Sequence, residues 1–172
     1  MVSRLDKWAV FFIALFASLT VLDSLTTYLG LTAFGLLEGD PHTKLRIESI
    51  GMVPGIILTG FVNPIIVLLT LSILIFPIRI LPRLRNHFRS ERSYSLSYLI
   101  IVSTRILSFM LLVGYCFFLI PTVINNYSLI MLGISFYMSR SINILSLVIG
   151  VFIGGVFAFS ICLRTGEIPR RL

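Results

Sequence analysis

A carboxylate inside an apolar helix is the first feature of this chain that could do chemistry. Asp23, in the stretch VLDSLTTYLGL, shares one helical face with Thr20, Thr27 and Gly30, because offsets of 3, 4 and 3 positions keep residues on one side of a helix. An ionisable residue at the centre of a membrane span costs ~2.5 to 3.5 kcal/mol. Asp23 therefore indicates a bonded partner in another helix, a contact with another chain, or a proton or cation site.

Two polar residues of other apolar segments are candidate partners of Asp23. Arg105 shares a helical face with Ser108 in the third segment, and Asn63 lies in the second. We expect the Asp23 carboxylate to pair with the Arg105 guanidinium or to accept a hydrogen bond from Asn63. The depths of Asp23 and Arg105 match only roughly, because they lie about 15 and about 9 residues from the same end of their helices, a gap of ~9 Å. An ion pair here would fix how the helices pack.

Small residues recur at every fourth position of the last apolar segment. This stripe consists of Ser146, Gly150, Gly154, Ala158 and Cys162. Small residues at this spacing let another helix backbone approach closely, as in G-x-x-x-G packing. The spacing leaves open whether that helix belongs to this chain or to a partner subunit.

The loop after the first apolar segment holds weaker candidates for a metal site. Glu38, Asp40 and His42 alternate, so an extended segment would place them on one side. Lys44 and Arg46 are close enough to pair with the acids, and we expect no metal there. The motifs G-x-S-x-G and H-E-x-x-H and a phosphate-binding glycine loop are all absent from the sequence, so we expect neither an enzyme nor a cofactor.

The elements that position these residues are four long apolar segments. The 172-residue chain is 57% hydrophobic and 12% charged, whereas a soluble domain carries about 25% charged residues. Each segment is long enough to cross a bilayer, and the first is too long for the apolar region of a signal peptide. We predict an all-α integral membrane bundle, one domain over 1–172, with four transmembrane helices at about 8–32, 54–80, 96–120 and 142–163.

Two stretches predict irregular structure within this plan. Pro64 follows Asn63 and removes a backbone hydrogen bond, which predicts a kink near Thr59 and Gly60. The stretch NNYSLIMLGISFYM, residues 125–138, is short for a span, and we expect an interfacial or re-entrant segment. It includes the sequon Asn126-Tyr127-Ser128, which could carry a glycan only in an organism equipped for it.

Basic residues set the predicted orientation. With four spans, ten Lys and Arg residues fall on the side of the two termini and the central loop, and only three, Lys44, Arg46 and Arg140, fall opposite. Both termini should therefore be cytoplasmic, with the protein in the plasma membrane. The basic residues alternate with the spans, so we expect contacts with membrane lipid and none with nucleic acid. Cys116 and Cys162 should lie near opposite faces of the membrane, too far apart for a disulfide.

The first span and its loop resemble an uncharacterised domain family of small prokaryotic membrane proteins that is frequent in archaea. The resemblance covers about Leu22 to Pro41 and rests on Asp23, Thr26-Thr27, Gly30, Gly35, Glu38 and Asp40-Pro41. Members of that family have a glutamate just before Asn-Pro, and Asp40 replaces the asparagine here. The resemblance implies a polytopic prokaryotic membrane protein in which Asp23, Glu38 and Asp40 form one constellation, and it implies no catalytic activity.

These observations favour a non-catalytic membrane subunit that packs in and stabilises a larger membrane protein complex, for example a respiratory or other membrane oxidoreductase assembly. Its partners would be other integral membrane subunits. The alternative is a small ion, solute or proton carrier that uses Asp23, Arg105 and Asn63. The two halves of the chain show no internal repeat, which weakens a transporter built on inverted repeats.

Overall fold

The computed structural model describes residues 4–35, 41–75, 96–133 and 140–165. The elements in these ranges are α1 (Arg4–Ala33), α2 (Pro41–Ile50), α3 (Met52–Ile57), the π-helical turn η1 (Leu58–Val62), α4 (Asn63–Ile75), α7 (Leu96–Leu132) and α8 (Arg140–Thr165). Four helical units are long and apolar enough to cross a membrane: α1, the run from α3 to α4, α7 and α8. The prediction of an all-helical fold with four helices that could span a membrane is confirmed for the described part of the chain.

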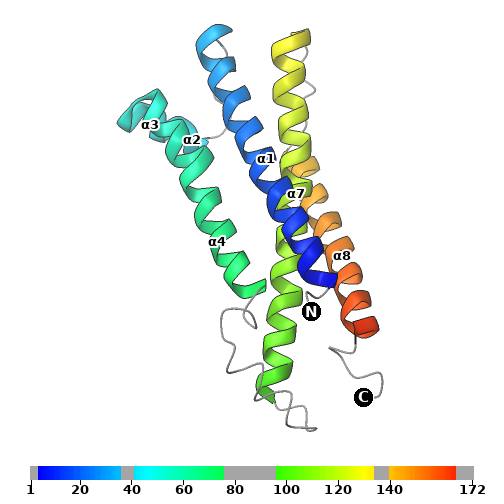
Figure 1. Ribbon diagram of the computed structural model, residues 1–172. Coiled ribbons are helices and arrows are strands. Elements are labelled where there is room, and N and C mark those ends of the chain that lie inside the picture. Colours follow the sequence, from blue (N-terminus) through cyan, green and yellow to red (C-terminus); the bar gives the residue numbers. More distant parts are fainter. Residues whose placement is uncertain (1–3, 36–40, 76–95, 134–139, 166–172) are drawn as a thin grey trace.

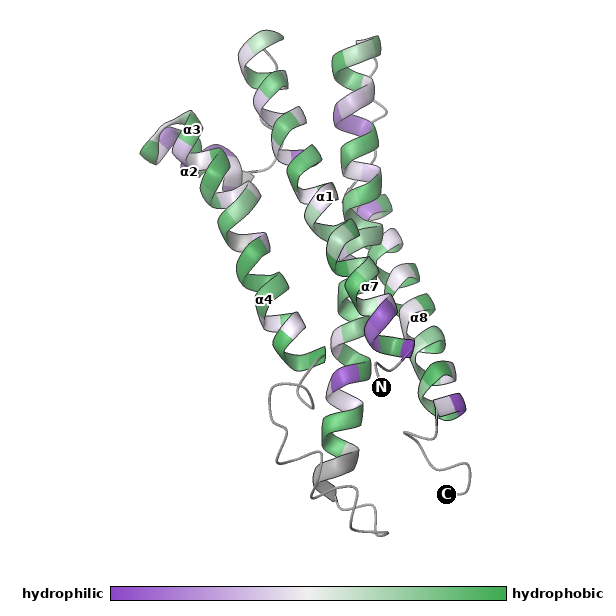
Figure 2. Ribbon diagram, viewed as in Figure 1, coloured by the Kyte–Doolittle hydropathy of each residue, from purple (hydrophilic) through white to green (hydrophobic). Residues whose placement is uncertain are grey.

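The four spans stand side by side, with α7 in contact with each of the other three. Figure 1 shows α8 along one side of α7 and α4 on the other side of α1. The first turn of α1, the last turns of α4 and α8, and the start of α7 all lie at the end drawn at the bottom, which we call the lower end. The short helices α2 and α3 lie beside the upper part of α1. Figure 2 shows hydrophobic residues along all four spans and hydrophilic residues toward their ends.

The four long helical units overlap the four predicted spans, and α7 extends beyond the predicted end of the third. Residues 125–132 continue this 37-residue helix, so the predicted interfacial or re-entrant segment is wrong for them, and residues 134–138 lie outside the described part. Pro121 lies inside the helix without ending it, because proline has a helical φ angle and removes only one hydrogen bond. Residues 76–80 of the predicted second span also lie outside the described ranges.

The predicted kink before Pro64 takes the form of a π-helical turn. This turn, η1, includes Thr59 and Gly60, and the Thr59 hydroxyl donates to the Gly55 carbonyl at 2.5 Å. A side chain at Gly60 would collide with the Ser24 hydroxyl of α1, so the backbones of η1 and α1 are in close contact. The kink therefore sets where α1 meets the second span.

An apolar core fills the space between the spans. It joins α1, α4, α7 and α8 through buried residues that include Phe16, Leu71, Phe109, Leu112 and Ala158. The rings of Phe12 and Phe109 meet edge to face at 5.6 Å, an arrangement that aromatic pairs favour. This core separates two groups of polar residues at different heights in the bundle.

Candidate functional site

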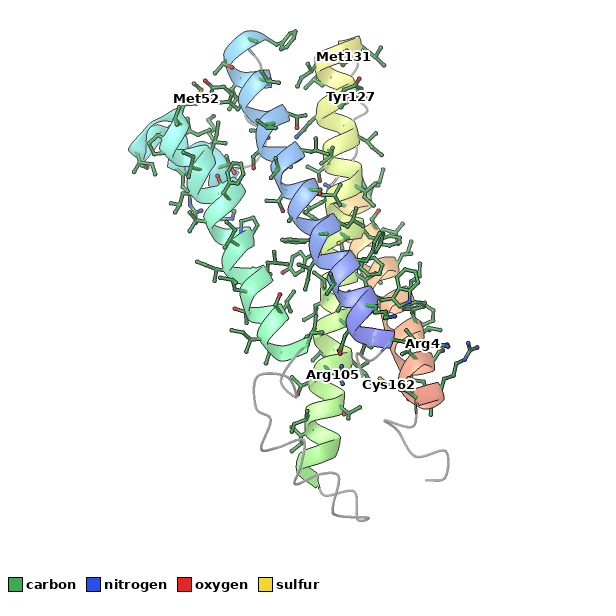
Figure 3. The ribbon with its side chains drawn as sticks, in the orientation of Figure 1. Arg4, Met52, Arg105, Tyr127, Met131 and Cys162 are labelled. Carbon is green, nitrogen blue, oxygen red and sulfur yellow. The ribbon has the colours of Figure 1, made fainter. Side chains whose placement is uncertain are left out.

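The lower polar cluster is centred on Arg105. Its Nη2 donates to Oδ1 of Asp6 at 2.8 Å, and its Nε donates to the carbonyl oxygen of Ile75 at 2.8 Å. The exposed fractions of the Arg105 and Asp6 side chains are only 4% and 10%. Figure 3 shows Arg105 at the lower end of the bundle, below the first turn of α1. One guanidinium thus links α7 to both α1 and α4.

Helix ends explain why these three groups meet. Asp6 lies in the first turn of α1, where the helix dipole favours a negative charge. Ile75 is the last residue of α4, and carbonyl oxygens in a last turn have no partner within their own helix and favour a cation. Arg105 satisfies both ends, and Ser108, one turn further along α7, is also buried, as predicted.

The predicted pairing of Arg105 with Asp23 is wrong. Asp23 is 17 positions beyond Asp6 on α1, about 26 Å further along the helix, so an arginine bonded to Asp6 is far out of reach of Asp23. The position of each residue along its predicted span could have identified the partner, because Asp6 lies close to the same end of the bundle as Arg105. The side chain of Asn63, the other predicted partner, lies outside the described part of the structure.

Asp23 belongs to an upper polar cluster that links α1, α7 and α8. Asn126 donates its Nδ2 to Oδ1 of Asp23 at 3.0 Å, and Asn143 of α8 donates its Nδ2 to the Thr122 hydroxyl at 3.3 Å. Thr122 and Asn126 are one turn apart on α7, so the two bonds lie close together. From the sequence, Asn126 is predicted only as a glycan acceptor, and neither Thr122 nor Asn143 is among the predicted site residues. The spacing of Thr122 and Asn126 on one helical face could have suggested the cluster.

The predicted polar stripe of α1 faces the interior. Thr20 and Gly30 are buried, and Asp23 and Thr27 are half-buried. The Ser24 hydroxyl donates to the Thr20 carbonyl at 2.9 Å, which satisfies the serine within its own helix. The stripe thus faces protein rather than lipid, as its small and polar residues require.

The small-residue stripe of α8 faces α7 of the same chain. A Cβ atom on Gly150 would lie 2.7 Å from Cβ of Phe117, and one on Gly154 would lie 2.9 Å from Cβ of Val113. Ala158 and Cys162 are fully buried, and Ser146 is half-buried. The alternative left open by the sequence is therefore settled in favour of an intramolecular neighbour.

Between the two polar clusters the described interior is apolar. The intervening levels are filled by Phe12, Phe16, Phe109, Leu112 and Val113, and the Cys116 thiol donates to the Phe12 carbonyl at 3.6 Å. An open pocket of about 220 Å³ lies between α1, η1, α4 and α7, and its exposed lining is almost entirely apolar, with residues such as Pro64, Val67 and Leu119. The described spans thus offer no continuous polar path between the clusters.

Of the exposed Trp and Tyr residues that the structure describes, three lie near an end of the bundle, and Tyr115 lies between them. Trp8 lies near the lower end, and Tyr28 and Tyr127 lie near the upper end, with exposed fractions of 44%, 39% and 57%. Tyr28 follows Trp8 by 20 positions, about 30 Å along α1, which equals the thickness of the hydrocarbon core. Trp and Tyr favour the membrane interfaces. We therefore expect each polar cluster to lie near one boundary of the hydrocarbon core.

The potential metal ligands are dispersed or lie outside the described ranges. Among the described residues no three His, Cys, Asp or Glu side chains gather as a metal site would need. Of the weak metal candidates, His42 is exposed on α2, whereas Glu38 and Asp40 lie outside the described ranges. Cys116 and Cys162 are buried free thiols.

Comparisons with known proteins do not place the chain in a family. A scan against protein-family models, a search of curated proteins and a search of solved structures each found no match. Function must therefore be inferred from the two polar clusters, the apolar core and the surface that the spans present to the membrane.

Proposed function

We propose that this protein is a non-catalytic integral membrane subunit that packs in and stabilises a larger membrane protein complex. The bonds described for its intramembrane charged groups support this role. Arg105 joins three helices through Asp6 and Ile75, and Asp23 is bonded to Asn126. Each contact holds one helix against another. The apolar core between the clusters favours this role over that of a carrier with a polar path.

The observation that carries the proposal is a groove on the outward face of α8. The stripe of this helix is covered by α7, yet its opposite face presents Phe152 and Val156 with exposed fractions of 70% and 54%. A groove of about 440 Å³ runs along this face and is lined by Phe152, Ile153, Val156, Phe157, Ser160, Ile161 and Arg164. Aromatic and aliphatic ridges flank it, and Ser160 and Arg164 supply polar groups, which suits a transmembrane helix of another subunit.

The proposed orientation follows from the positive-inside rule. The lower end carries Arg4 and Lys7 on α1 and Arg164 on α8, and the arginine-rich sequence between α4 and α7 follows the last described residue of α4 at this same end. We therefore assign the lower end to the cytoplasm of a prokaryotic cell. The groove then meets its partner in the cytoplasmic half of the membrane.

A photocrosslinking amino acid at Val156, in the full-length protein in native membranes, tests the proposal. We expect an adduct of defined mass with another integral membrane protein, and a lower level of the assembled partner when this chain is deleted. Ile65, exposed on α4, is the matched control position, where we expect lipid adducts only. A protein that stays monomeric, with only lipid adducts at Val156, would contradict the proposal.

A further inference from the structure

Arg164 is the charged residue among those that line the groove on α8. It is exposed and lies at the lower end of the groove, and the apolar lining extends above it as far as Phe152. Ser160, the other polar residue of the lining, already donates its hydroxyl proton to the Val156 carbonyl at 2.7 Å. Arg164 therefore supplies the charged hydrogen-bond donors with which the groove can recognise what binds there.

A helix that docks along the whole groove covers Arg164 together with the apolar residues. Arg164 and Val156 are eight positions apart on α8, which is about 12 Å along the helix. A helix in contact with both residues therefore continues to the lower end of the span. Shielding a cation from water is costly unless an anion lies beside it. The occupant must bring a negative charge to the level of Arg164.

A second copy of this chain does not fit that requirement. Asp6, the acidic residue described at the lower end, is buried and bonded to Arg105. Arg4, which Figure 3 shows at this end, and Lys7, one turn further along α1, are both exposed. Two copies with the same orientation would bring like charges together, which opposes association. On this side of the predicted topology ten residues are basic and three are acidic, namely Asp6, Glu91 and Glu167.

We propose that the groove on α8 binds a transmembrane helix of a different protein, and that an Asp or Glu near the lower end of that helix pairs with Arg164. This inference rests on the proposed function and specifies the chemistry of the partner. The guanidinium can donate to both oxygens of a carboxylate, which fixes the depth of the partner helix. The carboxylate lies about eight positions below the partner residue that faces Val156, since both helices rise 1.5 Å per residue.

Photocrosslinking from Val156 tests the pairing in the full-length protein, solubilised with its partner from native membranes. We expect the crosslinked partner to carry Asp or Glu about eight positions from the crosslinked residue, toward the lower end. In a dilution series in mild detergent, the concentration at which half of the adduct is lost should rise about fivefold in Arg164→Gln, the effect of a lost charge-assisted hydrogen bond. Lys7→Gln is the matched control, because Lys7 is exposed at the same end but does not line the groove. It should leave that concentration unchanged.

The possible outcomes separate this pairing from the proposed function. Exchange of the two charges, with Arg164→Glu in this chain and arginine in place of the partner's carboxylate, should restore the adduct. A protein adduct that forms equally well in wild type and Arg164→Gln would overturn the pairing and leave the proposed function standing. Equal weakening by Arg164→Gln and Lys7→Gln would also overturn it, because the attraction would then be one of overall charge, as anionic lipid produces. An adduct with a second copy of this chain would overturn it too, and lipid adducts alone in wild type would overturn both proposals.

Discussion

At the scale of single residues, Arg105 is the side chain on which the lower end of the bundle depends. It satisfies a carboxylate at the start of α1 and a carbonyl oxygen at the end of α4, and it is almost fully buried. A buried ion pair adds little stability compared with well-packed apolar residues, but removing one partner of such a pair is strongly destabilising. The fork of donors on arginine is what allows both bonds at once.

Substitution of Arg105 should therefore destabilise the bundle strongly. We expect Arg105→Gln to lower the free energy of unfolding by about 3 to 5 kcal/mol, because the Asp6 carboxylate loses a buried partner. Arg105→Lys should restore only part of this loss, since one ammonium cannot reproduce bonds from both Nε and Nη2. Unfolding in mixed micelles of a mild detergent and dodecyl sulfate measures the difference.

Lys7→Gln is the control for this prediction, because Lys7 is exposed beside Asp6 in the same turn of α1. Exposed substitutions of this kind change stability by about 0.5 kcal/mol or less. If Arg105→Gln were as stable as Lys7→Gln, the bonds of Arg105 to Asp6 and Ile75 would contribute nothing measurable to stability.

The sequence indicated that Asp23 and Arg105 lie on inner faces of the bundle, but it did not indicate which residues they contact. Asp23 and Arg105 both lie inside the bundle or on its inner faces, as their positions in apolar segments imply. Their partners, Asn126 and Asp6, come from about 100 residues away in the chain. Such pairs depend on the relative height of two helices, and a helix that extends by even two turns beyond its predicted end shifts that height by about 11 Å.

At the scale of elements, the contact between α7 and α8 depends on glycines, which have no side chain and so let the two helix backbones approach closely. Gly114 and Gly150 face each other, because a Cβ atom on Gly150 would lie 3.0 Å from Cα of Gly114. Without a hydrophobic driving force between helices in lipid, such close backbone approach provides the van der Waals contact that holds them together. The regular spacing made this stripe predictable, whereas its partner helix was not.

Adding one methyl group to this contact should separate the two helices. We expect Gly150→Ala or Gly154→Ala to cost about 1 to 3 kcal/mol, because each new Cβ would meet backbone or Cβ atoms that cannot move aside. Gly155→Ala is the control on the same helix, since its Cβ would meet the flexible end of the Met110 side chain. Unfolding in mixed micelles should rank Gly155→Ala closest to wild type, and equal losses at all three positions would contradict the arrangement.

The lengths of the elements were only partly predictable, because they also depend on contacts with neighbouring helices. The kink before Pro64 was predictable because proline lacks an N–H group, and the structure places a π-helical turn there. The extent of α7 could not be predicted in this way, because Pro121 also lacks an N–H group but lies within a continuous helix. Neighbouring helices determine which of these two outcomes a proline has.

At the scale of the whole molecule, the spans form an open arrangement around α7. Of the most apolar window in each span, 33% is buried in α7 but only 12% in the run from α3 to α4. The sequence predicted the number of spans from hydropathy alone, since apolar length is a local property. It could not predict that α8 packs on one face only, because that depends on contacts between elements.

The orientation of the molecule is predicted by charge and can be measured with single cysteines. Cys116 and Cys162 are fully buried, so an impermeant maleimide should leave the wild-type protein unlabelled. In intact cells we expect His42→Cys, exposed on α2, to react, and Arg164→Cys, exposed at the end of α8, to react only after the membrane is opened. Removing Arg164 leaves nine basic residues on the cytoplasmic side against three, so the variant should keep its orientation. Labelling of Arg164→Cys in intact cells would reverse the assignment, and equal labelling of both variants would indicate that the protein inserts in two orientations.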